Sequence, residues 1–447
     1  MKVNHNNIEP RQGSGKEGDG SMSVLLNEIL ADDNIALARK RVYANRGASG
    51  VDGVTVQELS TYMEENWQSI KAQIQERKYK PQPVLRVEIP KPNGGIRKLG
   101  IPTVVDRVIE QAIAQKLSPI FEPLFDDNSY GFRPGRRCEQ AIVKLLEYFN
   151  DGYEWIVDID LEKFFDNVPQ DKLMSFVNNV IHDGDTESLI RKYLRAGVMV
   201  KGKYEETNLG TPQGGNLSPL LSNIMLNELD KELNSRGLRF VRYADDCVIV
   251  VKSGAAATRV MYSVTEWIER KLGLKVNATK THTCRPMKLK YLGFNFWKDK
   301  EGKWRARPHQ DSIVKFKRRI KQLCKRSWSV NLDYRISKLN EVTRGWINYF
   351  AIADMKNVLA RIDSHLMTQI RVVIWKQWKV PSKREWGLRK MGIEKWRAHA
   401  LSYNKSPYIA AHLPQVKAAI PKKILTKRKH LVSPLDYYVQ KHALKLN

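Results

Sequence analysis

The segment FVRYADDCVIVV, residues 240–251, places two aspartates side by side between two apolar runs that have the composition of β-strands. Asp245 and Asp246 repel each other, so the pair costs stability unless a positive charge lies against it. Carboxylate oxygens are the ligands that Mg²⁺ prefers. The pair therefore indicates a divalent-metal site at a hairpin tip, although a plain polar turn is the commoner reason for such a pair.

Further aspartates, among them Asp160, occur upstream in WIVDIDLEKFFDNV at 155–168. Here Asp158 and Asp160 alternate with apolar residues, which predicts a strand with both carboxylates on one face. If this strand lies beside the Asp245–Asp246 hairpin, three carboxylates converge and can hold two Mg²⁺ ions roughly 3.5 to 4 Å apart. Such a centre suits phosphoryl transfer, in which positioning and electrostatics do most of the work.

The elements that must position these carboxylates can be predicted from hydrophobic periodicity and turn residues. Helical patterns precede and follow a hairpin whose strands, 84–90 and 96–102, are joined by the turn KPNGG. The other predicted elements are helices at 104–121, 138–150 and 264–273, a hairpin at 239–253, a second hairpin at 290–308, and helices starting near Ser312, Leu332 and Ile352 with a break at Pro381. This order predicts an α+β protein with an antiparallel sheet and a helical C-terminal part.

One loop and helix start are marked by GTPQGGNLSPLL at 210–221. Glycines at 214 and 215 allow close approach of the backbone to a neighbour. Ser218 is a good N-cap and Pro219 suits the first helical position. The first 21 residues are polar and Gly-rich, which is typical of a disordered tail.

The charge of the chain indicates a polyanionic partner. The 76 Lys and Arg against 48 Asp and Glu give a net charge of +28. Residues 311–447 hold 30 basic and 8 acidic residues, so +22 of that charge lies in the last third. Six of the eleven tryptophans lie there as well, namely Trp328, Trp346, Trp375, Trp378, Trp386 and Trp396. Cations with interleaved aromatic rings suit nucleic acid, and no apolar run is long enough to predict a membrane span.

The four cysteines, Cys138, Cys247, Cys284 and Cys324, form no C-x-x-C pair, which argues against a zinc ribbon and against a disulfide framework. With no apolar signal segment at the N-terminus, the expected location is intracellular and reducing.

Eight ordered stretches resemble the reverse transcriptases encoded by group II introns: GASGVDGV, IPKPNGGIRKLGIPTVVDRVIEQAI, YGFRPGRR, DIDLEKFFDNV, GTPQGGNLSPLLSNIMLNELD, RYADD, LKVNATKT and YLGF. GWINYF at 345–350 is similar to the maturase segment that follows the polymerase in that family. The resemblance implies a right-hand polymerase with fingers and palm over 22–308, a thumb and maturase region over 309–380, and a small basic DNA-binding domain over 381–447. No cysteine follows Cys324, so no zinc-containing nuclease is expected.

The resemblance also implies site residues. Asp160, Asp245 and Asp246 would be catalytic and, with the backbone carbonyl of Leu161, would bind two Mg²⁺ ions, or Mn²⁺ in their place. The residues that would contact the nucleotide or template are Lys91, Arg97, Arg133, Phe165, Gln213, Gly214 and Lys280. Phe165 would act as the aromatic gate against a ribose 2′-hydroxyl, with Phe164 as its core partner, and Lys280 as a general acid. Arg133 is almost as well explained by a structural ion pair.

The partners that the resemblance implies are group II intron RNA, an RNA template with a DNA primer, target DNA, dNTPs and a second copy of the chain, in a bacterial cytoplasm close to the nucleoid. Two other functions stay open. One is a free-standing bacterial reverse transcriptase in DNA repair or defence, and the other is an RNA-binding splicing cofactor without polymerase activity. The intact acidic residues argue against the second of these.

Overall fold

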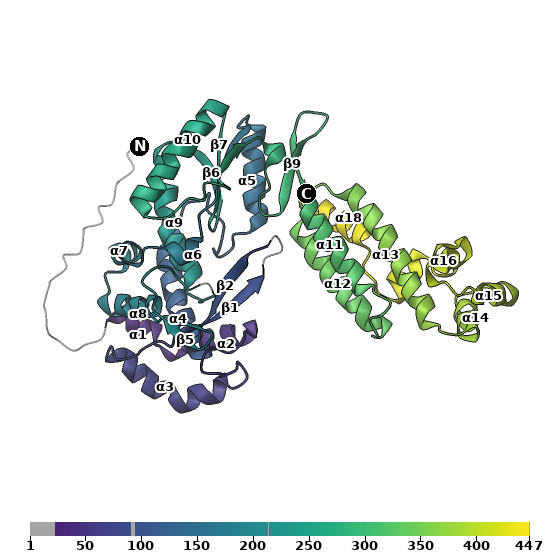
Figure 1. Cartoon of the computed structure of the whole chain (residues 1–447), viewed down its shortest axis with the longest axis horizontal. Helices are drawn as coiled ribbons and strands as arrows, with labels where there is room; N and C mark the ends of the chain where they lie inside the picture. The colour runs from purple at the N-terminus through teal and green to yellow at the C-terminus, as the bar shows by residue number, and fades with distance from the viewer. Residues whose placement is uncertain (1–22, 91–93, 213, 447) are drawn as a thin grey trace, which may run out of the picture. The chain divides into compact units, whose positions relative to one another are not determined.

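The computed structural model describes residues 23–90, 94–212 and 214–446 (Figure 1), with the side chains described as far as residue 442. It divides into two units that are discontinuous in sequence. The described parts of the first unit are 23–90, 94–125, 163–212, 214–228 and 272–274, and those of the second are 126–162, 229–271 and 275–446. The predicted tail, Lys91 and Gln213 lie outside the described residues.

The first unit combines helices with a small sheet. Its elements are α1 (Val24–Ile29), α2 (Asp32–Asn45), α3 (Leu59–Gln75), β1 (Val84–Pro90), β2 (Ile96–Ile101), α4 (Val104–Phe121), the 3₁₀ turn η1 (Glu122–Leu124), α6 (Phe164–Asn167), α7 (Gln170–Ile181), α8 (Gly184–Leu194), β4 (Val198–Val200) and β5 (Lys203–Glu205). The predicted helix 104–121 is confirmed as α4, which starts where the Thr103 hydroxyl accepts a hydrogen bond from the Asp106 N–H. α2 packs against α4.

The predicted hairpin is confirmed as β1 and β2, which pair antiparallel from Leu85 opposite Ile101 to Pro90 opposite Ile96. β1 also pairs in parallel with β4, giving a sheet of order β2-β1-β4-β5. The residues nearest the turn on β2 are exposed, because the hairpin extends away from the core there.

The second unit contains the sheet that carries the acidic residues, with strand order β6-β7-β3-β8. The strands are β3 (Trp155–Ile159), β6 (Arg239–Tyr243), β7 (Asp246–Val251) and β8 (His282–Cys284), and each neighbouring pair is antiparallel. Both faces of the sheet are covered: α5 (Cys138–Asn150) shares a core with Ile156 and Val248, while α10 (Gly254–Trp267) starts against the ring of Trp155. The near-continuous apolar sequence of β7 follows from this double burial.

The starts of α9 and α10 differ from prediction. α9 (Ser218–Ser235) includes Ser218 as its first residue, so the N-cap prediction for Ser218 was wrong by one position, and the Ser218 hydroxyl donates to the Pro212 carbonyl at 2.7 Å. α10 begins ten residues before the predicted 264, because the Ser253 hydroxyl caps it by accepting from the Ala256 N–H. It continues into the π-helical turn η2 (Ile268–Leu272).

The chain after β8 is a hairpin followed by helices. The elements are η3 (Pro286–Lys288), β9 (Phe294–Lys298), β10 (Trp304–Pro308), α11 (Gln310–Leu323), α12 (Leu332–Tyr349), α13 (Lys356–Gln377), α14 (Pro381–Lys390), α15 (Lys395–Ser402), α16 (Pro407–His412), α17 (Pro414–Ala419), η4 (Ile424–Arg428) and α18 (Pro434–Leu446). The start predicted at Leu332 is confirmed, and the chain does break before Pro381, which opens α14. The helix expected near Ile352 starts at Lys356 instead.

The segment beyond Pro381 packs onto the helices before it. α13 contacts α16 and α18, and one hydrophobic cluster includes Trp375 of α13, Val416 of α17 and Tyr438 of α18. The tryptophans of this region serve two purposes: Trp375 is fully buried in that core, whereas Trp386 and Trp396 are 62% and 66% exposed. The mixture of antiparallel sheets with a helical C-terminal part confirms the predicted α+β class.

All four cysteines are free thiols in the structure. Among the described residues, none of the helices combines the length and the apolar character that a bilayer crossing requires.

Candidate active site

The adjacent ends of β3 and β7 bring the predicted acidic residues into one region of the second unit. Ile159, the last residue of β3, pairs with Cys247 of β7. Continued by one residue, this register places Asp160 opposite Asp246, and Tyr243 on β6 is paired with Asp246. Asp160 therefore lies just beyond the strand rather than within it, next to the turn that contains Asp245. The register thus brings Asp160 and Asp246 to neighbouring strand ends, and the sharing of metal ions by these carboxylates stays a prediction.

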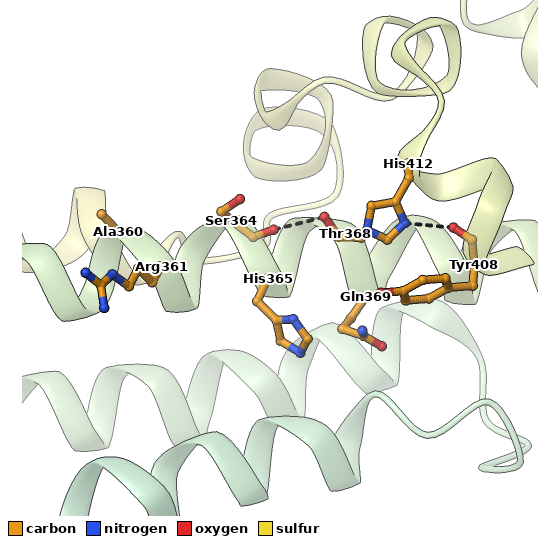
Figure 2. A pocket seen from close by; sticks show the side chains of 8 residues that line it. All are labelled: Ala360, Arg361, Ser364, His365, Thr368, Gln369, Tyr408 and His412. Atoms are coloured by element: carbon orange, nitrogen blue, oxygen red, sulfur yellow. Dashed lines mark hydrogen bonds between the residues drawn. The ribbon is translucent and has the colours of Figure 1, made fainter. Parts of the chain in front are cut away.

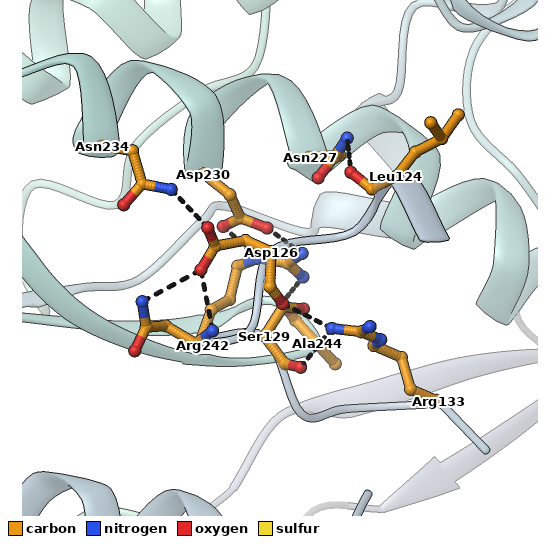
Figure 3. A network of polar contacts seen from close by, with 10 residues as sticks. Leu124, Asp126, Ser129, Arg133, Asn227, Asp230, Asn234, Arg242 and Ala244 are labelled. Carbon is orange, nitrogen blue, oxygen red and sulfur yellow. Dashed lines mark hydrogen bonds and ion pairs between the residues drawn. The ribbon is translucent and has the colours of Figure 1, made fainter. Parts of the chain in front are cut away.

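The turn between β6 and β7 is held in place by the Arg242 side chain (Figure 3). Its guanidinium is fully buried and donates from Nε to the Asp230 carboxylate at 2.7 Å and from Nη1 to the Ala244 carbonyl at 2.9 Å. Asp230 lies on α9, so the ion pair fastens the base of the turn to that helix. Removal of one charge from a buried pair of this kind strongly destabilises the fold, because the other charge is left uncompensated.

The loop before α5 lies directly against the same turn. The Tyr130 N–H donates to the Arg242 carbonyl at 2.9 Å. A Cβ placed on Gly131 would come within 2.2 Å of the Ala244 nitrogen. Ala244 itself has φ +57°, a left-handed conformation that a non-glycine residue rarely adopts. Glycine at 131 thus permits the backbone approach that supports a strained turn.

Asp160 is held by the loop that precedes β8. The Asn277 N–H donates to the Asp160 carbonyl at 2.8 Å, and the Asp160 N–H donates to the Thr281 hydroxyl at 3.1 Å. Lys280 of the same loop places Nζ 3.2 Å from an Asp160 carboxylate oxygen. The predicted nucleotide contact Lys280 therefore lies in the acidic cluster.

Burial and mutual repulsion raise the pKa values of two carboxyl groups in this cluster. Limited access to water, and next the charges of Asp245, Asp158 and Asp160, raise the pKa of Asp246 to about 7. Desolvation raises the pKa of Asp158 to about 6, against the opposing effect of the neighbouring His282. Burial and neighbouring negative charges oppose the ionisation of these carboxyl groups, and a cation bound beside them would favour it.

The donor set suits Mg²⁺, since the predicted ligands are carboxylate and carbonyl oxygens without sulfur. Within the described ranges, however, the structure does not gather three His, Cys, Asp or Glu side chains into a group that could hold a metal ion. Lys280 forms an ion pair with Asp160 in this cluster. Metal binding at this cluster stays a prediction.

The backbone around Leu161, the predicted carbonyl ligand, is tied down on both sides. Leu161 forms an isolated antiparallel bridge with Val276, made by the Asp160 carbonyl and by the Glu162 N–H, which donates to the Lys275 carbonyl at 2.8 Å. The Leu161 side chain is buried. Its carbonyl is therefore on a backbone segment with little freedom to move.

The Arg133 side chain forms hydrogen bonds within the protein. It is buried, and its guanidinium donates to the main-chain carbonyls of Asp126 and Ser129, as Figure 3 shows. These bonds close the loop that leads to Gly131. Both of these partners are carbonyls rather than the carboxylate of an ion pair, and a contact of Arg133 with template or nucleotide stays a prediction.

The remaining predicted site residues that are described belong to the first unit. Phe165 is half-buried, its ring lying edge-on to the buried Phe164 at 5.2 Å between centroids, and its carbonyl accepts from the Thr211 N–H at 2.7 Å. Arg97 is exposed on β2. Gly214 has φ +119°, and a Cβ there would meet the Gly100 carbonyl oxygen at 2.3 Å. The backbone of β2 therefore approaches Gly214 too closely for a side chain at that position. The nucleotide contacts of these residues stay predictions.

Sequence reasoning did not single out Glu110, which organises the loop that follows Gly214. Its buried carboxylate accepts the Asn216 N–H at 2.6 Å and crowds Gly215. Complete burial, and next the charge of Asp106, raise the pKa of Glu110 to about 8. An acidic residue on the apolar stripe of a helix was the signal for this role. Arg242 and Asp158 were likewise given no site role, although they are the first residues of the quoted motifs RYADD and DIDLEKFFDNV.

Comparison with known families assigns most of the chain. Residues 89–296 match the family model described as "Reverse transcriptase (RNA-dependent DNA polymerase)", and residues 313–392 match "Group II intron, maturase-specific domain". The first match contains every described carboxylate of the acidic cluster. The second match covers α12, α13 and α14.

Individual relatives agree with these matches. The group II intron-encoded protein LtrA of Lactococcus lactis subsp. cremoris is 39% identical over 225 residues, covering 50% of this chain and 37% of LtrA. Protein YkfC of Escherichia coli K12 is 33% identical over 297 residues, covering 58% of this chain and 78% of YkfC. The putative COX1/OXI3 intron 2 protein of Saccharomyces cerevisiae is 26% identical over 373 residues, or 69% and 42% of the two chains.

The chain spans little more than a third of the length of LtrA. The fold is of the right-hand polymerase type, with an antiparallel palm sheet followed by a helical thumb and maturase region. On these matches, the chain belongs to the family of reverse transcriptases with a maturase domain that group II introns encode.

Proposed function

We propose that the protein is an RNA-directed DNA polymerase, which extends a DNA primer along an RNA template with dNTPs. The observation that carries the proposal is the position of Asp160 beside the Asp245–Asp246 turn, at the neighbouring ends of β3 and β7. Carboxylates gathered at the end of a rigid sheet are the arrangement that nucleotidyl transfer needs.

In the proposed site, Asp160, Asp245 and Asp246, with the Leu161 carbonyl, hold Mg²⁺ or Mn²⁺. Two bound ions would activate the primer 3′-hydroxyl and neutralise charge on the departing pyrophosphate. The protein's own part is positional: Arg242 and Asp230 secure the turn, while Asn277 and Thr281 secure Asp160. Lys280 exchanges its contact with Asp160 for the triphosphate and acts as the general acid.

The first unit supplies the nucleotide contacts. Arg97 on β2 contacts the triphosphate, and Gly214 contacts the nucleotide and the template. Lys91 and Gln213, which lie outside the described residues, are proposed for the same two roles on the family resemblance alone. The half-buried ring of Phe165 rejects a ribose 2′-hydroxyl by its bulk, since its edge-on contact with Phe164 limits how far it can turn.

We also propose that the helical part binds group II intron RNA as a maturase, and that residues 381–447 contact target DNA. The support is the maturase match together with the +22 charge of 311–447. Exposed Trp386 and Trp396 lie beside cations, with Lys390 Nζ 4.8 Å and the Arg397 guanidinium 4.9 Å from their ring centroids. The intron-encoded role is preferred to a free-standing repair or defence enzyme because the maturase segment is present.

Primer extension on an RNA template, with dNTPs and Mg²⁺, tests the polymerase. Asp245→Ala is expected to abolish synthesis and to leave RNA binding at its parental level. The matched control is Asp151→Ala, which removes an exposed carboxylate at the far end of the palm helix α5 and is expected to keep full activity. Synthesis that persists in Asp245→Ala at the parental rate would refute the assignment.

A further inference from the structure

A polar pocket of about 540 Å³ lies on the solvent side of α13, in the second unit (Figure 2). One wall is a stripe of α13 side chains that includes Arg361, His365 and Gln369, and the other wall is Tyr408 and His412 of α16. The opposite stripe of α13, with Ile362 and Leu366, is buried in the core. The polar stripe therefore takes no part in packing α13 against the core.

The pocket favours an anionic ligand. The residues that line it are one arginine, two histidines and five neutral residues, and none of these lining residues is acidic. Asp363, the acidic residue of α13, is buried away from the pocket, where the Lys422 ammonium lies 3.1 Å and the Ser433 hydroxyl 2.6 Å from it. Its charge is compensated there, so the charge of Arg361 dominates the opening.

The pocket also favours a flat ligand. The Tyr408 and His412 rings lie 4.4 Å apart at 49°, and Tyr408 is 58% exposed. A hydrogen bond between His412 Nδ1 and the Tyr408 carbonyl, at 2.8 Å, fixes the imidazole in place. Figure 2 shows both rings on the α16 side, facing Thr368 and Gln369 of α13. A base stacked on these rings would present its edge to the Gln369 amide, which both donates and accepts.

We propose that this pocket binds one unpaired nucleotide of single-stranded RNA, with the base against Tyr408, its edge at Gln369 and a phosphate near Arg361. Thr368 favours RNA over DNA: its hydroxyl donates to the Ser364 carbonyl at 3.1 Å, which leaves its lone pairs to accept from a ribose 2′-hydroxyl. The site rests on the proposed RNA-binding function and deepens it, since unstacked bases are what proteins read in RNA.

The test uses the full chain and a short unstructured RNA that carries 4-thiouridine, with photo-crosslinked peptides mapped by mass spectrometry. Crosslinks are expected in 361–369 and 408–412. Tyr408→Ala is expected to weaken RNA binding by about tenfold, whereas Tyr408→Phe, which keeps the ring, retains it. Tyr262→Ala is the matched control, because Tyr262 is an exposed tyrosine on α10 of the palm.

Parental affinity in Tyr408→Ala, with crosslinks elsewhere, would overturn the site while leaving the proposed function intact. Equal crosslinking of a matching 4-thiothymidine DNA would overturn the assignment to RNA. If the parent chain bound no RNA at all, the proposed function would fail together with the site. Circular dichroism of each variant establishes that it is folded.

Discussion

The Arg242 guanidinium meets the Asp230 carboxylate at 2.7 Å in a fully buried ion pair, and the same guanidinium holds the carbonyl of Ala244, the residue just before Asp245. The aspartates of YADD therefore depend on a third aspartate, on α9, for their position. Burial makes this pair a requirement for the fold, since either charge alone has no solvent to compensate it.

Asp230→Asn is expected to lower the free energy of unfolding by about 3 kcal/mol, because it leaves the Arg242 charge buried without a counter-ion. Urea denaturation measures the change. Asp151→Asn, which removes the partner of Arg239 in an exposed ion pair, is the control and should change stability by less than about 1 kcal/mol. Equal effects of the two variants would show that burial does not govern the Asp230 pair.

Gly131→Ala is expected to reduce primer extension by at least about tenfold, since its Cβ would displace the Ala244 nitrogen and with it the turn that carries Asp245 and Asp246. Steady-state kinetics of extension measures the loss. Gly184→Ala adds the same methyl group where no atom lies within 4 Å, and it should behave as the parent chain. A fully active Gly131→Ala would mean that the turn has room to move.

Lys280→Met is expected to lower kcat for nucleotide addition by roughly a hundredfold, the usual range for loss of a general acid. Stability should change little, because Lys280 is 63% exposed and its ion pair with Asp160 is screened by water. The control is Lys290→Met, which removes the partner of Asp311 in another exposed pair. A change in KM for dNTP with unchanged kcat would assign Lys280 to binding alone.

The raised pKa of Glu110, about 8, makes the stability of the first unit depend on pH. The folded state holds this proton more tightly than the unfolded chain, whose Glu pKa is about 4.5. Stability from this group is therefore fully present below about pH 4.5 and is lost as the pH rises toward 8. Within that window the slope is about 1.4 kcal/mol per pH unit.

Glu110→Gln removes this titration while keeping a group of the same shape. Denaturation at several pH values is expected to give a difference between parent and variant that changes steadily from pH 5 to 8 and is constant above it. A difference that is independent of pH would contradict the protonated form of Glu110 in the folded chain.

The sequence alone determined the elements with strong local signals and the acidic motif. Thr103 and Asn331 mark helix starts by their own hydrogen bonds, and the β1–β2 hairpin follows from alternation and its glycine turn. The pairing of Asp160 with the Asp245 turn could be proposed because strands rich in apolar residues tend to pair within one sheet. The helix starts and the hairpin depend on residues that are close in the chain, whereas the pairing of Asp160 with the Asp245 turn joins distant segments.

Only the tertiary structure decided what the long-range neighbours are. From the sequence, Arg133 could be a template contact or part of a structural ion pair, and the structure shows that it closes a loop through carbonyls. Likewise, Trp375 is core while Trp386 is surface. Glu110 and Asp230 read as ordinary helical acids, and their roles arise from the loop and the strand that fold against them. Burial is a property of the assembled chain, so neither the shifted pKa of Glu110 nor the buried ion pair of Asp230 can be derived from local sequence.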